Sequence, residues 1–248
     1  MKYSIGVGTF NKRFEKYFKP LINQIKTYRP ELEIIVHINA PLREQFDENY
    51  RKEILNFCSE QANIFPIITP VQRGFSKIVN TCLIYSSNNN ILMLNDDLTI
   101  ISKKFFDELE KILKFSSSSF KINGSWSHIF LNRQEVNDVG WMDERYLGFG
   151  EEDGDFEWRY QEKLNKPFVS YNLPDIENHV EQNDFSENME VIYKKYSAFN
   201  TKFAFQHKYK EDEAGKKYGI MNKKLICINE TKNQYPNEKF FWLNKDKV

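Results

Sequence analysis

Two clusters of carboxylates stand out in the sequence, and each has a composition that could support chemistry. The first is NDD, Asn95 to Asp97, directly after the apolar run ILML. The second is EEDGDFE, residues 151–157, behind the glycines of YLGFG. Carboxylate oxygens suit a hard divalent cation, which offsets the repulsion between neighbouring acids. A positioned carboxylate can also act as a general base. The clusters therefore indicate metal binding and proton transfer.

Each cluster also has a purely structural interpretation. Asn-Asp after a buried strand is a common polar turn, and acids in the first turn of a helix each stabilise it by about 0.3–1 kcal/mol. The helix effect explains two or three acids, hardly five in seven positions. An EF-hand is excluded because Trp158 and Leu164 stand where its glycine and bidentate glutamate belong. A haloacid-type phosphatase is disfavoured because Leu98 stands two positions after Asp96, where a second aspartate is needed.

The elements that must position these clusters alternate along the chain. Strand-like apolar segments occur at residues 3–7, 32–38, 64–68 and 91–94, with helical patterning in most of the intervals. This alternation predicts an α/β fold with a mainly parallel central sheet. Ligands bind at the carboxyl ends of such strands, where the NDD cluster would lie. Because side chains alternate in an extended segment, we expect Asp96 to point away from Asn95 and Asp97.

Three helices and one further strand are expected around this sheet. Ser76 is the expected N-cap of FSKIVNTCLIYSS, and Ser102 that of KKFFDELEKILKF. A strand is predicted over residues 127–131 and a helix over 155–165. With no internal repeat and no obvious linker, residues 1–248 are interpreted as a single domain whose C-terminal part is less regular.

Composition narrows the possible partners and compartments. Lys plus Arg and Asp plus Glu are equal at 35 each, so no global field would attract nucleic acid. Three scattered cysteines, Cys58, Cys82 and Cys227, form no CxxC pair and support neither a disulfide framework nor a zinc site. No apolar run approaches the roughly 20 residues that span a bilayer. These features predict a cytoplasmic protein.

Aromatic residues near the C-terminus leave two interpretations open. Phe240, Phe241 and Trp242 lie among lysines. They could contact the inner face of a membrane peripherally. They could equally dock on the core as a terminal helix or strand.

The two acidic motifs together resemble those of family 2-type glycosyltransferases with the GT-A fold. In this chain, a strand ending in NDD is followed about 45 positions later by GWMDERYLGFGEEDGDFEWR. The second motif is most similar to the acidic run of β-galactosyltransferase-type enzymes. The likeness covers roughly residues 3–180 and is specific at the two motifs.

The resemblance implies a DXD-like metal site for Mn²⁺ or Mg²⁺. Asp97 matches the metal ligand, and Asp96 matches the position near the donor ribose or sugar. Asn95 departs from the family pattern because it replaces the first aspartate. His179 matches a histidine that completes the metal site in the galactosyltransferase-type enzymes.

For the second motif the resemblance implies the catalytic base and the acceptor site. Asp153 matches the general base, Glu152 its acceptor-binding neighbour, and Phe149 an aromatic that lines the acceptor site. Gly154 stands where the relatives carry an acid. Arg73, in QRGFSK, matches a basic position near the donor.

The N-terminal segment matches the nucleoside-contacting part of the family. Thr9, Asn11 and Arg13 follow the first strand as those residues do, although GVGTFNKR lacks the glycine-rich loop of sugar nucleotidyltransferases. His37 or Asn39, at the end of the second strand, stands where the family often has an acid near the base. A packing role for His37 is an equal alternative.

The resemblance implies an inverting hexosyltransferase that uses a UDP-sugar, with galactose or N-acetylgalactosamine as first candidates. The acceptor would be a glycan or lipid-linked glycan in bacterial surface polysaccharide synthesis. Residues 1–100 would bind nucleotide, 101–180 would hold acceptor and base, and 181–248 would form an extension. Two alternatives stay open: a non-catalytic carbohydrate- or nucleotide-binding module with Trp126, Trp141 and Phe149 as its platform, and a sugar nucleotidyltransferase.

Overall fold

The computed structural model describes residues 1–40, 46–179, 189–218, 223–227 and 237–247. The chain divides into two compact units. Unit 1 comprises Met1–Arg73, Thr81–Gln134 and Val169–Asp184, and unit 2 comprises Gly74–Asn80, Glu135–Phe168 and Phe185–Val248. Part of the predicted extension over 181–248 lies outside the described residues. The predicted functional boundaries at residues 100 and 180 stay predictions.

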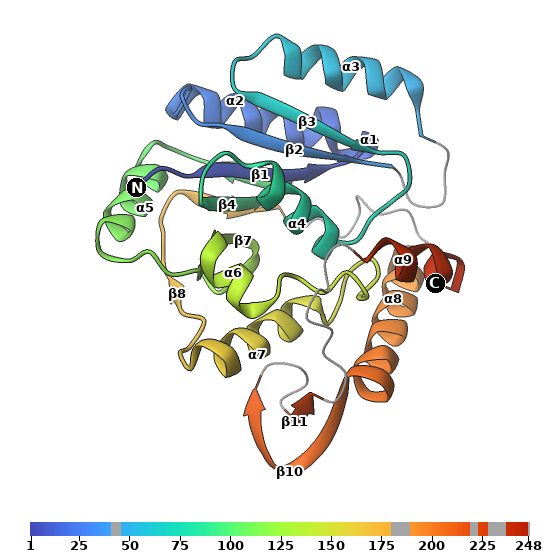
Figure 1. Ribbon diagram of the computed structural model, residues 1–248. Helices are drawn as coiled ribbons and strands as arrows, with labels where there is room; N and C mark the ends of the chain where they lie inside the picture. Colours follow the sequence, from blue (N-terminus) through green and yellow to red (C-terminus); the bar gives the residue numbers. More distant parts are fainter. Residues whose placement is uncertain (41–45, 180–188, 219–222, 228–236, 248) are drawn as a thin grey trace. The chain divides into compact units, whose positions relative to one another are not determined.

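Unit 1 is built on a seven-stranded sheet in the order β3-β2-β1-β4-β7-β6-β8 (Figure 1). The first four strands of this order run parallel to one another, which confirms the predicted mainly parallel sheet. β7 runs antiparallel to β4 and β6, and β6 is parallel to β8. The strands are β1 (Ser4–Thr9), β2 (Ile34–Asn39), β3 (Ile64–Thr69), β4 (Asn90–Asn95), β6 (Phe120–Ile122), β7 (Ser125–Asn132) and β8 (Ser170–Tyr171).

Alternating apolar side chains fix the main core of unit 1. Ile5 and Val7 of β1 share one face of the sheet with Val36 of β2 and Leu92 of β4. Four helices bury their apolar stripes in this core, as the helical patterning predicts. They are η1, a π-helix (Phe14–Phe18), α2 (Lys19–Tyr28), α3 (Glu48–Ser59) and α5 (Lys104–Phe115), preceded by the short α1 (Asn11–Arg13).

On the other side of β1, Gly6 allows α4 (Phe75–Tyr85) to approach the strand closely. A Cβ atom at Gly6 would lie 2.4 Å from Met93 Sδ and 2.8 Å from Cys82 Cβ. The predicted cap at Ser76 is wrong, since α4 already begins at Phe75. The predicted cap at Ser102 is wrong by one residue, since Lys103 is the N-cap of α5. The hydroxyl of Ser102 still accepts the backbone N–H of Lys104 at 3.2 Å.

A short ribbon completes unit 1 next to the acidic end of β4. β5 (Leu98–Ile100) pairs antiparallel with β9 (Ile176–Asn178). The backbone N–H of His179 donates to the carbonyl of Asp97 at 2.9 Å and so continues this pairing by one step.

Unit 2 contains most of α6 (Arg133–Val139) and a set of elements from the second half of the chain (Figure 1). These are α7 (Glu152–Leu164), α8 (Met189–Phe203), the π-helix η3 (Ala204–Lys208), the hairpin of β10 (Tyr209–Tyr218) and β11 (Lys223–Cys227), α9 (Glu238–Asn244) and the 3-10 turn η5 (Lys245–Lys247). α7 begins three residues before the predicted start at Asp155. Among the described helices, none is both long and apolar enough to span a bilayer.

The C-terminal aromatics divide between the interior and the surface of unit 2. Phe241 is 7% exposed, and Phe240 packs on a core cluster that includes Phe203 and Tyr209. Trp242 is 51% exposed. The segment therefore docks on its own unit through two aromatics, and membrane contact through Trp242 stays a prediction.

Candidate functional site

The first acidic cluster lies where β4 ends. The strand stops at Asn95, and Asp96 and Asp97 form a turn. Both carboxylates meet the same guanidinium: Arg13 Nη1 lies 2.8 Å from Asp96 Oδ1, and Nη2 contacts Asp97 Oδ2. The predicted opposite directions of the two aspartates are wrong, because a turn replaces the extended backbone on which that prediction depended.

Arg13 is held in place by aromatic rings as well as by the carboxylates. Its guanidinium carbon lies 5.4 Å from the ring centre of Tyr17 and 5.8 Å from that of Phe10. A guanidinium within about 6 Å of a ring face is attracted by the ring quadrupole. The side chain is only 11% exposed, so this cation is a fixed part of the site. A nucleoside contact by Arg13 stays a prediction, as do those of Thr9 and of Asn11, which begins α1.

Asp96 has the most buried side chain among Asp96, Asp97 and Arg13. It is 1% exposed, and burial raises its pKa to about 7, with Arg13 opposing and Asp97 adding to the effect. Thr9 lies close enough to lower that pKa slightly. Tyr50 of α3 borders the same carboxylate: burial, and then the charge of Asp96, raise the pKa of its phenol. Sequence reasoning missed Tyr50, because its pattern is that of any residue on the apolar face of its helix.

The cluster fits a divalent cation in its donor chemistry. Asp96 Oδ2 and Asp97 Oδ1 are buried and have no hydrogen-bond partner among the described atoms. Mg²⁺ and similar cations are commonly held by one or two carboxylates, with water and substrate phosphates completing the shell. Among the described residues, no group of three or more His, Cys, Asp and Glu side chains is gathered as a metal cage. Asp97 and Asp96 are therefore the side chains that could hold such an ion.

His179 lies beside Asp97 through the main chain, with its ring turned to another partner. Its Nε2 is 2.5 Å from the hydroxyl of Thr99, and it is Asp97's carbonyl that accepts its backbone N–H. The chain thus brings His179 next to the acidic turn across 82 positions of sequence. Metal ligation by His179, and by Asn95 at the end of β4, stays a prediction.

A second group of polar side chains lies at the C-terminal ends of β2 and β3. Asn39 accepts the backbone N–H of Arg73 and donates to its carbonyl, both at 2.8 Å. The hydroxyl of Thr69 donates to Asn39 Oδ1 at 3.1 Å and lies 3.0 Å from Nε2 of the fully buried His37. Asn39 and His37 therefore hold the loop that leads to Arg73, which agrees with the packing alternative for His37. A donor contact by Arg73 stays a prediction.

The second acidic cluster belongs to what we call the acidic loop, residues 147–157 of unit 2. Asp153 lies in the first turn of α7, where its Oδ1 accepts the N–H of Gly154 at 2.7 Å. Glu152 is 6% exposed, and burial together with Asp153 raises its pKa to about 8. Glu151 has a left-handed backbone, with φ of 75°, and Thr201 donates to its carboxylate at 3.3 Å. Burial also raises the pKa of Glu151.

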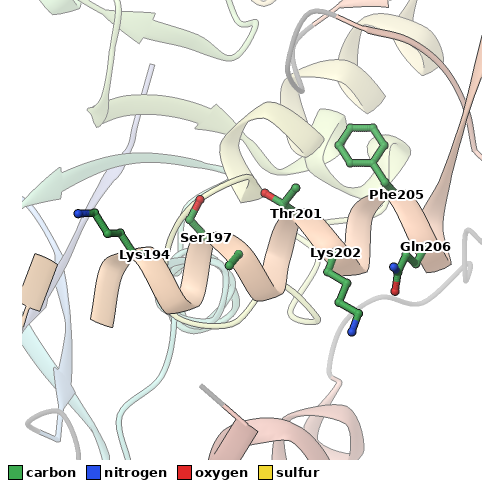
Figure 2. A pocket seen from close by; sticks show the side chains of 7 residues that line it. Lys194, Ser197, Thr201, Lys202, Phe205 and Gln206 are labelled. Carbon is green, nitrogen blue, oxygen red and sulfur yellow. The ribbon is translucent and has the colours of Figure 1, made fainter. Parts of the chain in front are cut away.

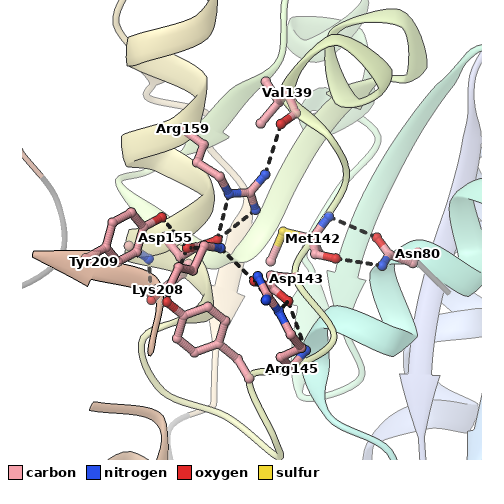
Figure 3. Close-up of polar contacts among 12 residues, drawn as sticks. Asn80, Val139, Met142, Asp143, Arg145, Asp155, Arg159, Lys208 and Tyr209 are labelled. Atoms are coloured by element: carbon pink, nitrogen blue, oxygen red, sulfur yellow. Dashed lines mark hydrogen bonds and ion pairs between the residues drawn. The ribbon is translucent and has the colours of Figure 1, made fainter. Parts of the chain in front are cut away.

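Asp155 has a structural role instead. It belongs to a buried ion cluster with Asp143, Arg145, Arg159 and Lys208 (Figure 3). Lys208 Nζ lies 2.6 Å from Asp143 Oδ2 and 2.5 Å from Asp155 Oδ1. Arg159 Nη2 is 2.7 Å from Asp155 Oδ2, and Arg145 Nη2 is 2.8 Å from Asp143 Oδ2. Three cations thus neutralise two carboxylates, so part of the acid content of the motif stabilises unit 2.

Unit 2 also carries a groove along α8 and η3, with a volume of about 570 Å³ (Figure 2). Its described lining offers amine, hydroxyl and amide groups and one aromatic ring: Lys194, Ser197, Ala198, Thr201, Lys202, Phe205 and Gln206. Thr201 connects this groove to the acidic loop through Glu151. The ring of Phe149, predicted to line an acceptor site, lies 5.4 Å from the ring of Tyr196 on the same helix.

No protein-family model matches the chain, and no curated protein does either. Solved structures do match. S. aureus TarS superposes with a TM-score of 0.55 at 18% identity, over 79% of this chain and 39% of TarS. TarS 1-349 has been solved with UDP, at a TM-score of 0.52 and 16% identity over 83% of this chain and 72% of that one.

A second solved protein matches the fold at a similar TM-score. Glucosyl-3-phosphoglycerate synthase from Mycobacterium tuberculosis, in complex with Mn²⁺, UDP and phosphoglyceric acid, matches with a TM-score of 0.55 at 14% identity, over 80% of this chain and 76% of that one. At such identities a likeness carries the fold alone. The mainly parallel central sheet and the structural neighbours show that the chain has the GT-A glycosyltransferase fold.

Proposed function

We propose that this chain is a metal-dependent glycosyltransferase that moves a sugar from a UDP-sugar to a hydroxyl group of a glycan or lipid-linked glycan. The observation that carries the proposal is the pair Asp96 and Asp97 at the end of β4, with two buried carboxylate oxygens that have no hydrogen-bond partner within the part of the chain that the structure describes. Structural neighbours that contain UDP, one of them with Mn²⁺, support the nucleotide and the metal.

The proposed donor groups belong to unit 1. When bound, a divalent cation would offset the negative charge that develops on the leaving diphosphate. Asp97 is the proposed ligand, with His179 and Asn95 as candidates beside it. Asp96 would lie near the ribose or sugar of the donor, and Arg73 would be a basic group near the donor. Thr9, Asn11 and Arg13 would contact the nucleoside. The low exposure of Asp96 and Arg13 favours strong charge interactions there, because water is largely excluded.

The proposed acceptor groups belong to unit 2. Asp153 would take the proton from the attacking hydroxyl, and direct displacement would invert the anomeric configuration. Asp153 suits this role because it is only partly buried and lies outside the ion cluster that occupies Asp155. Glu152 and Phe149 would bind the acceptor. Galactose and N-acetylgalactosamine remain the first donor sugars to test, in a bacterial polysaccharide pathway.

The test compares Asp153→Asn with wild type in a UDP-release assay with manganese. It supplies UDP-glucose, UDP-N-acetylglucosamine, UDP-galactose and UDP-N-acetylgalactosamine in turn, each with methyl glycosides of glucose, galactose and N-acetylglucosamine as probe acceptors. A positioned base contributes about 10²- to 10⁴-fold, so we expect kcat to fall by that factor while UDP affinity stays within about twofold. Glu157→Gln, on the same helix, is the matched control and should retain wild-type turnover. Normal turnover by Asp153→Asn would remove it as the base.

Two other functions are distinguished by this assay together with a second reaction that supplies a sugar phosphate and a nucleoside triphosphate. A carbohydrate- or nucleotide-binding module would bind UDP and release none from any donor. A sugar nucleotidyltransferase would form a nucleotide sugar from a sugar phosphate and a nucleoside triphosphate, and would release pyrophosphate. Either result would replace the proposed transferase.

A further inference from the structure

One buried amide side chain binds the backbone of the acidic loop at several points. Asn200 of α8 is fully buried. Its Oδ1 accepts the backbone N–H of Leu147 at 2.9 Å, and its Nδ2 donates to the carbonyls of Leu147 and Gly150, both at 2.8 Å. A single side chain therefore spans the turn that leads into α7.

The backbone of this turn needs such a partner. Gly148, Gly150 and Glu151 all have left-handed φ values, of 60°, 102° and 75°. A backbone of this shape forms neither a helix nor a strand, so its buried N–H and C=O groups must find partners elsewhere. The carbonyl of Gly148 accepts the backbone N–H of Phe75 at 2.8 Å, which leaves the polar groups of Leu147 and Gly150 to be bonded. The amide of Asn200 supplies one acceptor and two donor hydrogens, which match the groups that the turn presents.

The same helix closes over the turn with an aromatic ring. A Cβ atom on Gly148 would lie 2.6 Å from the ring of Tyr196, so α8 touches the backbone at that point with no room for a side chain. Four residues later along the helix, Asn200 makes its bonds. α8 therefore fixes both the position and the conformation of the turn.

A second anchor lies on the far side of Asp153. Lys208, which ends η3 directly after α8, binds Asp155 in the first turn of α7. Asp153 thus stands between two points that are both held by residues 200–208: Gly150 before it and Asp155 after it. A free loop would give its side chain no fixed position.

We propose that Asn200 is a positioning residue for Asp153: it sets the backbone of residues 147–150, and through it the start of α7, in the orientation that proton transfer requires. This inference rests on the proposed transferase function. A misplacement of about 1 Å can cost about 10² in rate, so the effect should appear in kcat and in the acceptor KM. Donor affinity should not change.

The variant Asn200→Asp tests this with little change in shape. Its carboxylate can still accept the N–H of Leu147, but it loses both donor bonds and sets a charge against two carbonyl oxygens. Asn200→Ala removes all of the bonds. Asn244→Asp is the matched control: this buried asparagine of α9 donates to the carbonyl of Phe240 at 2.7 Å and has no described contact with the acidic loop.

With the methyl glycoside that wild type uses as probe acceptor, we expect kcat of Asn200→Asp to fall about 10- to 100-fold and the KM for that glycoside to rise. The UDP Kd should stay within twofold, and Asn244→Asp should be unchanged. Rates are normalised to UDP-binding sites, so that a loss of folded protein does not count as a loss of kcat. Amide hydrogen exchange supplies a readout independent of turnover: the N–H of Leu147 should exchange faster in both Asn200 variants, while the strands of unit 1 keep wild-type protection.

Wild-type kcat and acceptor KM in Asn200→Asp, or unchanged exchange at Leu147, would overturn the positioning role and leave the transferase in place. A wild-type protein that transfers no sugar from any donor would overturn the proposed function. It would also remove the catalytic role proposed for the bonds of Asn200. The two failures are therefore told apart by wild-type turnover.

Discussion

The substitution Glu152→Gln should remove a loss of stability that the wild-type protein suffers as the pH rises. Glu152 is 6% exposed, and its Oε2 is buried without a hydrogen-bond partner among the described atoms. Burial and the neighbouring charge of Asp153 raise its pKa from 4.5 to about 8. The folded protein therefore prefers the neutral acid over a range of pH in which the unfolded chain is ionised.

The sign of the effect follows from proton uptake. Between pH 4.5 and about 8 the folded state binds one more proton than the unfolded state at this position, so stability falls as pH rises through that window and levels off above it. Each unit of pKa difference corresponds to about 1.4 kcal/mol, which sets an upper limit of about 5 kcal/mol above pH 8. At pH 5 the same calculation leaves less than about 1 kcal/mol.

Thermal unfolding of wild type and Glu152→Gln between pH 5.0 and 8.5 measures this difference. Glutamine has nearly the shape of the protonated acid, so the two proteins should unfold at similar temperatures at pH 5. By pH 8.5 the variant should be more stable by about 2–5 kcal/mol, which is a rise in Tm of at least about 4 °C for a chain of this size. Glu157→Gln, which removes a charge from the same helix at a partly exposed position, should follow the wild-type pH profile. A Tm difference between Glu152→Gln and wild type that does not change with pH would refute the reasoning.

Three further substitutions test other features. Lys208→Met should lower the free energy of unfolding in urea by about 3 kcal/mol, near the lower end for a broken buried ion pair. The loss stays near that end because each of the two aspartate partners of Lys208 keeps one arginine. Lys210→Met, at an exposed position, is the control and should leave the free energy of unfolding almost unchanged. Gly6→Ala should destabilise unit 1 by about 1–3 kcal/mol in the same assay, because its methyl group would lie 2.8 Å from the Cβ atom of Cys82 in α4. A wild-type unfolding midpoint would contradict the close approach of α4. Asp97→Ala should abolish the extra thermal stability that UDP with manganese confers relative to UDP with EDTA; if the wild-type shift persisted, Asp97 would not be a ligand.

The strands of the parallel sheet were predictable because their signal is local. Each one is a short apolar run, and the structure places all four within two residues of the predicted bounds. The position of the acidic turn followed from the end of the last run at Asn95. Helix starts were less predictable: Ser76 looked like a cap but lies inside α4, since a cap depends on backbone conformation rather than on residue type alone.

The roles of individual acids were not predictable, because burial and long-range partners decide them. Asp153 and Asp155 lie two positions apart in one motif, yet only Asp155 meets a buried lysine 53 positions later. Similarly, Arg13 meets Asp97 across 84 positions. No spacing rule connects such residues, since their contact depends on how the strands and helices pack.

The order in which the chain leaves the ribosome separates the two acidic sites. Asp96 and Asp97 emerge after their counter-ion Arg13 has already been made, so this turn can be neutralised as soon as β4 joins the sheet. The acidic loop has no such advantage, because Asn200 follows Leu147 by 53 residues. At about 5–20 residues per second, the loop waits roughly 3–10 s for the amide that binds its backbone and for the lysine that binds Asp155. During that interval Asp155 has Arg159, four residues later, but not yet Lys208. Unit 2 can complete its core only after the segment through Tyr209 has been synthesised.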